Sequence, residues 1–326
     1  MLFELLDKAI VYEATDLHVE MGEQPRVRGP NGLEMLQDYV VNRNLFSAIY
    51  EQCGGGPDLV DGAFSYKHIR VRVHLFSAGG KQCGTLRLLY SRELLLGDDE
   101  DGNVLRQLAC LSDGLVIISG PTCSGKSYTL AGCIQYINQQ ARKHIVTLED
   151  PVEFVFANDK SLIHQRQLGQ DVTSMAEGVR EALREDPDVI MIGEMRDRAT
   201  LEAALHAAET GHLVFATLHT QRAVMAINRI ISMFPAEQQD EVRSQLSQVL
   251  RAVICQRLVR LEKQFVTVRD VLLNNAAVSN LIRQRKEPQI VSIQETQRPM
   301  RTLEMAVALA ERRWGPRKEF KSLIEA

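Results

Sequence analysis

The run Gly120-Pro121-Thr122-Cys123-Ser124-Gly125-Lys126-Ser127 constrains the fold of this chain more than any other feature. It has the pattern G-x-x-x-x-G-K-S, and it lies between an apolar run at 115–119, which predicts a buried strand, and a segment that predicts a helix. In that setting the two glycines let the backbone wrap around a phosphate group, so that successive N–H groups and the helix N-terminus face it. The pattern therefore predicts a phosphate-binding loop, or P-loop, in a parallel α/β sheet.

The side chains of the P-loop predict a nucleotide with a bound cation. Lys126 is expected to bridge the β- and γ-phosphates, and Ser127 is expected to ligate Mg²⁺. We therefore predict ATP and Mg²⁺ as cofactors. The residues expected to contact the nucleotide are Gly120, Pro121, Thr122, Cys123, Ser124, Gly125, Lys126, Ser127 and Tyr128.

Acidic residues follow two further apolar runs that predict parallel strands. The cluster 149–153, which ends with Glu153, follows the run 145–148, and the cluster 193–197, which contains Glu194, follows the run 189–192. Ligands of open α/β sheets bind at the carboxyl ends of the strands, so both clusters are expected near the phosphates. A carboxylate there can activate the attacking water or hold Mg²⁺ through a water. The alternative for each carboxylate is a helix N-cap or a surface ion pair.

Two histidines flank a fourth apolar run, 213–217. His219 follows the run at its carboxyl end, where it is expected to reach the γ-phosphate as a sensor or hydrogen-bond donor. His212 precedes the run and is expected to be structural, bound to a neighbouring carbonyl. Zinc binding by this pair is not expected, because no cysteine or carboxylate spacing matches it.

The 326-residue chain is long enough for two domains. We predict an N-terminal α+β domain over 1–92, with an opening amphipathic helix, a helix at 44–53 and a hairpin of 69–75 with 85–90. The acidic stretch 97–102 predicts a linker over 93–103. The remainder, 104–326, is expected to hold the α/β core, a long helix from 236 to 258, and further helices beyond 276.

The composition indicates which partners and which cellular location to expect for the protein. A formal net charge of −4 gives no electrostatic footprint for nucleic acid or an acidic membrane surface, so we expect no nucleic-acid partner. No apolar run approaches the roughly 18 residues of a membrane span, and the start of the chain carries charges. We therefore expect a cytoplasmic, unprocessed protein. The 6 cysteines form no C-x-x-C pair, which predicts reduced thiols.

Four sequence blocks over 113–259 resemble those of the type II/IV secretion ATPases, and most closely those of the pilus-retraction ATPases. They are the P-loop, the aspartate box at 147–153, the Walker B-like stretch at 183–197 and the histidine box at 208–220. Thr15-Asp16-Leu17-His18-Val19, followed by Pro25-Arg26-Val27-Arg28, also resembles the family. The resemblance implies a RecA-like ATPase core preceded by a PAS-like domain.

The resemblance also implies roles and partners. Glu153 corresponds to the proposed water-polarising glutamate, and Glu194 corresponds to the Walker B glutamate that holds Mg²⁺ through water. The family implies a homohexamer that passes the work of ATP hydrolysis to an inner-membrane platform protein of a pilus or secretion system, and arginines that contact the γ-phosphate. The candidate arginines are Arg70, Arg72, Arg87, Arg184 and Arg229.

Two departures from the family pattern bear on function. Cys123 stands where the family has glycine, so we expect slower hydrolysis that is sensitive to thiol alkylation. The cysteine-rich zinc insertion of the assembly ATPases is absent, which favours a motor for pilus retraction over one for extension. The compact ATPases of type IVB, conjugative or type II secretion systems remain alternatives. A RecA-like nucleic-acid motor and a non-hydrolytic nucleotide-binding regulator are alternatives of other classes.

Overall fold

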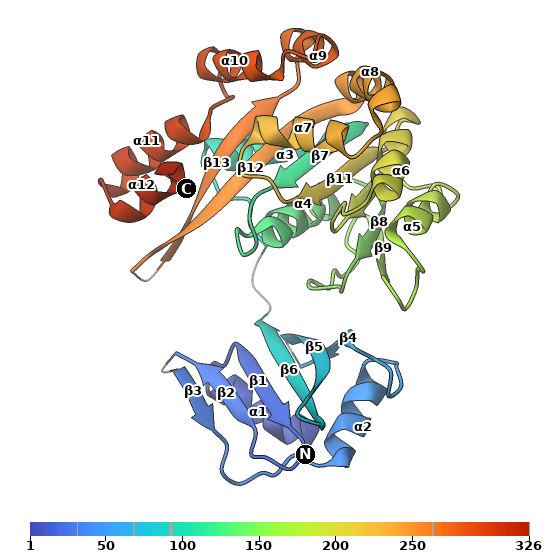
Figure 1. Ribbon diagram of the computed structural model, residues 1–326, viewed down its shortest axis with the longest axis vertical. Coiled ribbons are helices and arrows are strands. Elements are labelled where there is room, and N and C mark those ends of the chain that lie inside the picture. The colour runs from blue at the N-terminus through green and yellow to red at the C-terminus, as the bar shows by residue number, and fades with distance from the viewer. Residues whose placement is uncertain (31, 68, 91–93, 263, 326) are drawn as a thin grey trace. The chain divides into compact units, whose positions relative to one another are not determined.

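Strands β5 (Ile69–Ala78) and β6 (Lys81–Tyr90) form the antiparallel hairpin that the alternation of apolar residues predicts. Val71, Val73 and Leu75 are buried, while the residues between them are half-buried or exposed. The computed structural model describes residues 1–30, 32–67, 69–90, 94–262 and 264–325 (Figure 1). The chain divides into two compact units, Met1–Glu93 with Pro151–Val155 and Leu94–Asp150 with Phe156–Ala326.

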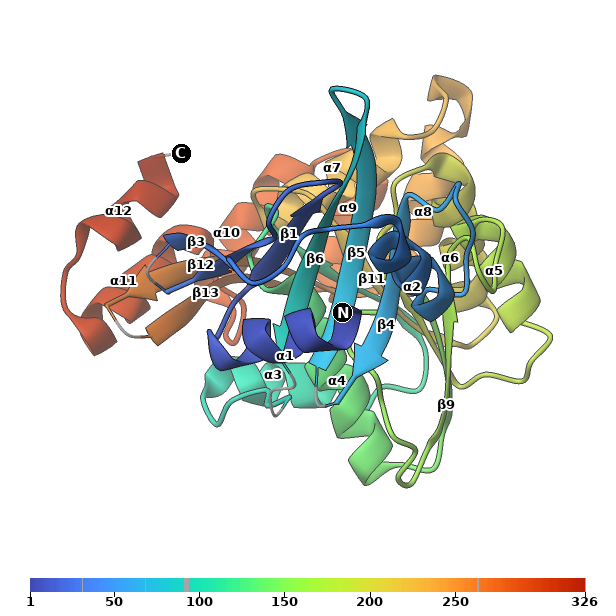
Figure 2. The same cartoon turned by 90° about the horizontal axis from the view of Figure 1, so that it is seen from below.

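The first unit is an antiparallel sheet with two helices on one face. Over the described residues its strands lie in the order β3-β2-β1-β6-β5-β4. Both predicted helices are confirmed, and they lie over one face of the sheet (Figure 2). Their apolar faces join the inward side chains of the sheet in one core. The remaining elements are α1 (Leu2–Val11), β1 (Asp16–Glu20), β2 (Arg26–Gly29), β3 (Gly32–Met35), α2 (Arg43–Gln52) and β4 (Asp61–Tyr66).

The second unit is built on a mostly parallel sheet. The order of its described strands is β13-β12-β7-β11-β10-β8-β9, in which β13 alone runs antiparallel to its neighbour. All four predicted strands are confirmed, as β7, β8, β10 and β11. The strands are β7 (Gly114–Ser119), β8 (His144–Glu149), β9 (Leu162–Gln167), β10 (Val189–Ile192), β11 (Leu213–Leu218), β12 (Leu250–Leu261) and β13 (Gln264–Leu273).

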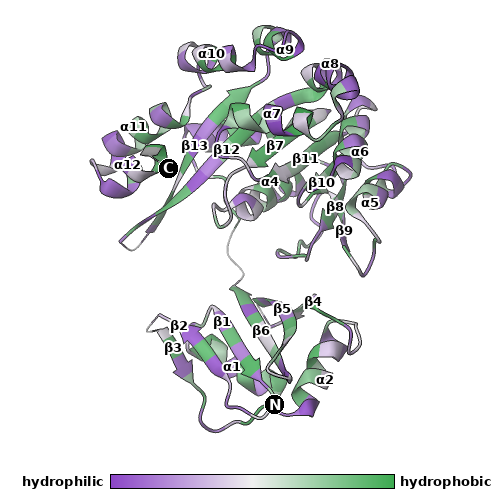
Figure 3. Ribbon diagram, viewed as in Figure 1, coloured by the Kyte–Doolittle hydropathy of each residue, from purple (hydrophilic) through white to green (hydrophobic). Residues whose placement is uncertain are grey.

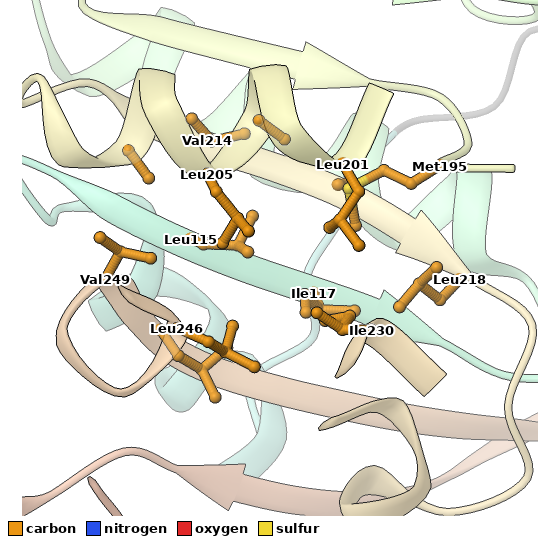
Figure 4. Close-up of a cluster of buried hydrophobic side chains, with 14 of the residues drawn as sticks. Leu115, Ile117, Met195, Leu201, Leu205, Val214, Leu218, Ile230, Leu246 and Val249 are labelled. Atoms are coloured by element: carbon orange, nitrogen blue, oxygen red, sulfur yellow. The ribbon is translucent and has the colours of Figure 1, made fainter. Parts of the chain in front are cut away.

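Helices cover both faces of this sheet. The central strands are buried on both sides, which is why they are continuous apolar runs (Figure 3). On one face, side chains of β7 and β11 pack against α6, α7 and α8 (Figure 4). On the other face, alternate residues of β7 pack against α3 and α4. The helices named here are α3 (Glu100–Ala109), α4 (Lys126–Gln140), α5 (Met175–Ala182), α6 (Arg198–Glu209), α7 (Ala223–Ser232) and α8 (Gln239–Val249).

The C-terminal region contains further helices, as predicted beyond residue 276. They are α9 (Ala276–Arg283), η2 (Glu287–Gln289), α10 (Ile290–Thr296), α11 (Leu303–Trp314) and α12 (Lys318–Glu325). Helices α11 and α12 pack on the far part of the β12–β13 hairpin around Val259, Leu303 and Phe320. No helix in the described part of the chain has both the length and the apolar character needed to cross a bilayer.

The predicted long helix from 236 to 258 is wrong. A short η1 (Ala236–Gln238) leads into α8, which ends at Val249, and the chain continues as β12. Residues 250 and 252–255 pair in parallel with β7, so this segment extends the sheet next to the strand that carries the P-loop. A segment buried on both sides is apolar without alternation, and here its spacing happened to match a helix.

The acidic stretch that predicts a linker is partly helical. Asp99 caps α3 by accepting a hydrogen bond from the Gly102 N–H, and the next two residues form the first turn of the helix. Glu100 pairs with Arg301, and Asp101 pairs with both Arg269 and Arg301. The carboxylates therefore fasten α3 to the C-terminal half of the unit instead of lying in solvent.

Asp270 is a buried carboxyl of β13 that caps a helix far away in sequence. It accepts hydrogen bonds from the Ala223 N–H at the start of α7, at 2.8 Å, and from Gln294 Nε2, at 2.8 Å. Burial raises the pKa of Asp270 from 3.8 to about 6, and the two hydrogen bonds only partly oppose that rise. The folded state therefore keeps a proton on Asp270 over a range in which the unfolded chain has lost it.

Stability is expected to fall as the pH rises through this range, because the folded state binds the proton more tightly. Asp270→Asn should remove that slope. Relative to the wild type, its free energy of unfolding should improve by up to about 3 kcal/mol between about pH 4 and about pH 7. Urea unfolding of both proteins across this range is the measurement. Parallel pH profiles would contradict a protonated carboxyl at this position.

Candidate active site

The P-loop adopts the strand–loop–helix geometry that its sequence predicts. It leaves the carboxyl end of β7 in the middle of the sheet and ends at Gly125, the N-cap of α4. Gly120 has φ +145°, and a Cβ there would lie 2.4 Å from the Gln256 carbonyl oxygen, so only glycine fits. Cys123 also has a positive φ, +63°, and its side chain is exposed. A backbone in this left-handed region favours glycine, which agrees with the glycine that the resembled family has at the position of Cys123.

Three predicted site residues meet at the carboxyl edge of the sheet. Lys126 Nζ lies 3.4 Å from His219 Nδ1, and His219 Nε2 lies 3.2 Å from Glu194 Oε1. Parallel pairing of β7, β11 and β10 causes this meeting, since the three residues follow neighbouring strand ends. The P-loop lysine, the histidine and the acidic residue thus form one continuous polar line.

Glu194 is held as a carboxylate by a neighbouring arginine. Arg196 Nη2 lies 2.9 Å from Glu194 Oε2, and Arg196 Nη1 lies 3.3 Å from Asp150 Oδ2. Burial raises the pKa of the Glu194 carboxyl, but the hydrogen bond from Arg196 and the charges of Arg196 and His219 outweigh burial and lower it. The group is therefore negatively charged at neutral pH.

The surroundings of Lys126 suit an anion. Its side chain is buried, and in the described part of the chain its Nζ donates to the carbonyl oxygens of Gly120, at 2.9 Å, and Pro121, at 3.0 Å, rather than to a carboxylate. Burial lowers the pKa of Lys126, and the Glu194 charge opposes that change. A buried ammonium in a loop of backbone N–H groups fits a nucleotide phosphate.

The residues present also fit Mg²⁺ bound together with a nucleotide. Ser127 is exposed at the first turn of α4, and Glu194 lies at the same sheet edge. Among the described residues, no group of three His, Cys, Asp or Glu side chains could form a metal cage. Magnesium commonly keeps several waters and binds through substrate phosphates with few protein ligands, so a hydroxyl and a second-sphere carboxylate suffice.

Neighbouring acidic residues have structural partners. Glu149 is buried at the end of β8 and accepts hydrogen bonds from Thr147 Oγ1, at 2.7 Å, and Gln165 Nε2, at 3.0 Å. Asp197 caps α6 by accepting from the Thr200 N–H at 2.9 Å. For Asp197, the alternative interpretation as an N-cap is therefore the observed one.

Glu153 falls within the first compact unit. Its Oε1 lies 3.5 Å from Arg72 Nη1, and the neighbouring carbonyl of Val152 accepts a hydrogen bond from Arg70 Nε at 3.1 Å. Two of the candidate arginines therefore lie beside the residue predicted to polarise water. Arg87, the third on the hairpin, instead pairs with Asp16 at 2.9 Å.

The predicted arginines Arg184 and Arg229 lie apart from the line of Lys126, His219 and Glu194. Arg184 is exposed on the turn before β10, at the amino edge of the sheet, opposite the edge that carries the P-loop. Arg229 is exposed in the last turn of α7. Tyr128 Oη accepts from the Leu95 N–H at 3.2 Å. His212 Nδ1 lies 3.0 Å from the Ala207 carbonyl oxygen, as its expected structural role requires.

Sequence reasoning did not select two residues that the structure brings to the site. Arg196 was part of the Walker B-like stretch without a role, and it binds Glu194. Gln256 was inside the wrongly predicted helix, and its Nε2 donates to the Ser124 carbonyl oxygen in the P-loop at 2.8 Å. A polar residue after the apolar run 252–255 was the available signal for Gln256.

Comparisons with known proteins agree with this geometry. The model of a family described as type II/IV secretion system protein matches residues 63–314. The twitching motility protein of Neisseria gonorrhoeae is 45% identical over 240 residues, which are 73% of this chain and 64% of that protein. The type IV pilus retractation ATPase PilT of Pseudomonas aeruginosa is 36% identical over 316 residues, which are 93% of this chain and 92% of that protein. This chain thus spans less than two thirds of the gonococcal relative.

Solved structures share the fold. A crystal structure of the pilus retraction motor PilT with bound ADP has a TM-score of 0.87 and 36% identity, covering 98% of this chain and 95% of that one. The ATPase DotB of Legionella pneumophila shares the fold at a TM-score of 0.78 with 24% identity, covering 98% of this chain and 94% of that one. The predicted RecA-like core with a smaller N-terminal α+β domain is confirmed. Because the family model matches well over half of its residues, the chain belongs to the type II/IV secretion system protein family.

Proposed function

We propose that this protein is an ATP-hydrolysing motor that powers the retraction of a type IV pilus. The observation that carries the proposal is the polar line from Lys126 through His219 to Glu194 at the P-loop. It supplies a phosphate-binding cation, a hydrogen-bonding histidine and a charged carboxylate at one sheet edge. The names of the Neisseria and Pseudomonas relatives support pilus retraction as the process served.

Each side chain has a distinct role in the proposed reaction. Lys126 stabilises the charge on the β- and γ-phosphates, and His219 donates a hydrogen bond to the γ-phosphate as its charge changes. Glu153 orients the attacking water and accepts its proton. Ser127 and, through a water, Glu194 hold Mg²⁺, which supplies neutralising charge to the phosphates when it is bound.

The proposed working form is a homohexamer. Arg184 and Arg229 are exposed and lie away from the line of Lys126, His219 and Glu194 in their own subunit, so we propose that they act on the nucleotide of a neighbouring subunit. The motor would lie in the cytoplasm and bind the inner membrane through a platform protein. ATP hydrolysis would drive that partner through nucleotide-dependent switching of the motor.

Deletion of the gene in its own host tests the process. Loss of a retraction motor should make surface filaments accumulate, and restoring the wild-type gene, but not a Glu153→Gln copy, should return them to normal. Loss of filaments would indicate an extension motor, and unchanged filaments with lost secretion would indicate a secretion ATPase. Either result would overturn the retraction proposal. Turnover stimulated by added DNA would instead favour a nucleic-acid motor.

A further inference from the structure

Gln256 is a buried polar residue that contacts both ends of the P-loop. Gln256 is 1% exposed. Its neighbour Cys255 pairs with Ser119, the last residue of β7, which places Gln256 beside the start of the loop. Its carbonyl oxygen is the atom that a Cβ at Gly120 would meet, and its Nε2 lies 3.4 Å from the position of a Cβ at Gly125. A buried amide requires hydrogen-bond partners, and Gln256 finds them in the loop and in the helix that follows.

The hydrogen bonds around Gln256 form a chain with one consistent direction. Arg269 Nη2 donates to Thr129 Oγ1, 3.5 Å away; an arginine has no acceptor, so the hydroxyl oxygen must accept. The Thr129 hydroxyl is then free to donate to Gln256 Oε1, 3.0 Å away. With its oxygen turned to Thr129, the Gln256 amide presents Nε2 to the Ser124 carbonyl oxygen, 2.8 Å away.

The far end of this chain is anchored by charge. Arg269 is largely buried, and its Nη1 lies 3.3 Å from Asp101 Oδ2 in the first turn of α3. Burial lowers the pKa of Arg269, and the nearby Asp99 charge opposes that change. The ion pair with Asp101 holds the guanidinium in place, so the orientation of Thr129, and through it that of Gln256, is fixed from outside the loop.

The bond to Ser124 constrains a donor inside the loop. The peptide between Ser124 and Gly125 is planar and trans, so the Gly125 N–H points opposite to the Ser124 carbonyl. When Gln256 holds the carbonyl toward β12, it holds that N–H away from β12. Backbone N–H groups of such loops are the donors that bind phosphate, and their value depends on being oriented before the ligand arrives.

We propose that Gln256 is a positioning residue that holds the P-loop ready for the nucleotide phosphates, with Thr129, Arg269 and Asp101 fixing its amide. The inference rests on the proposed nucleotide-binding function and deepens it. In this proposal Gln256 acts by orienting the P-loop backbone and contacts neither the phosphates nor the attacking water. Loss of the amide should weaken nucleotide binding more than it slows the chemical step.

Gln256→Met tests the proposal, because methionine keeps a similar length without a donor or acceptor for these bonds. The dissociation constant for ADP with Mg²⁺, measured by calorimetry, should rise about tenfold, the equivalent of one buried hydrogen bond. The KM for ATP should rise by a similar factor with a much smaller change in kcat. Gln284→Met, at an exposed glutamine of the C-cap of α9, is the matched control and should bind like the wild type.

A pair of variants at Thr129 keeps the test decisive if the methionine variant folds poorly. Thr129→Val removes the hydroxyl and should weaken ADP binding about threefold or more, whereas Thr129→Ser keeps the hydroxyl and should bind like the wild type. A purely structural role would lower the melting temperature of Gln256→Met and leave its ADP affinity unchanged, which would overturn the proposal. Failure of the wild type itself to bind ADP would instead overturn the proposed function.

Discussion

Glu153→Gln should bind ATP with nearly wild-type affinity and hydrolyse it about 100-fold to 10,000-fold more slowly, the usual loss for a missing general base. The amide keeps the shape of the side chain but cannot accept a proton from water. Nucleotide affinity is expected to survive because it depends on the P-loop and on Lys126. Phosphate release at saturating ATP, with calorimetric binding measured on the same preparation, gives both quantities.

A matched control separates this role from a general effect of lost charge. Glu177→Gln removes an exposed carboxylate in the first turn of α5, where it pairs with Arg180 three residues away. An exposed ion pair of this kind contributes at most about 1 kcal/mol, so turnover should stay at the wild-type value. Normal turnover by Glu153→Gln would refute the assigned role of Glu153.

Lys126→Ala should weaken ATP binding about 10-fold to 100-fold, since a charge-assisted hydrogen bond to phosphate contributes about 1.5–3 kcal/mol. The lysine is already buried in the loop and bound to its carbonyl oxygens, so it is placed for the phosphates before they arrive. The measurement is a titration of the variant with ATP and Mg²⁺.

The control for this variant is a lysine at the other edge of the same sheet. Lys143 precedes β8 and pairs with Asp188 at 2.7 Å, at the amino end of the strands. Lys143→Ala removes a cation of the same kind far from the P-loop and should leave ATP affinity unchanged. Equal losses in the two variants would show that net charge, rather than the place of Lys126, governs binding.

Where the sequence carried a local signal, the structure could be predicted from it. Glycine spacing predicted the P-loop, and alternation predicted the β5–β6 hairpin. The meeting of Glu194 with His219 was also predictable, because parallel strands end at one edge of a sheet. For the P-loop and the hairpin, a few neighbouring residues contain the whole signal.

Long-range pairing accounts for what could not be predicted. The apolar residues of 250–258 have a spacing that suits a helix. This segment forms a strand because it pairs with β7, which is far away in the sequence. The acidic stretch 97–102, which includes the first turn of α3, resembles an exposed linker until Arg269 and Arg301, more than 160 residues later, supply its partners. Gln256 was missed for the same reason, since Ser124 and Thr129, which it contacts, lie more than 120 residues earlier in the chain.

One measurement most directly tests whether this chain is an ATP-hydrolysing enzyme: phosphate release from ATP by the purified protein, with and without Mg²⁺. The structure predicts sustained release that requires Mg²⁺ and that falls about 5-fold to 50-fold in Lys126→Ala at ATP concentrations near the wild-type KM, as its weaker ATP binding implies. Wild-type protein that binds ATP with Mg²⁺ but releases phosphate no faster than Glu153→Gln would contradict a hydrolytic site.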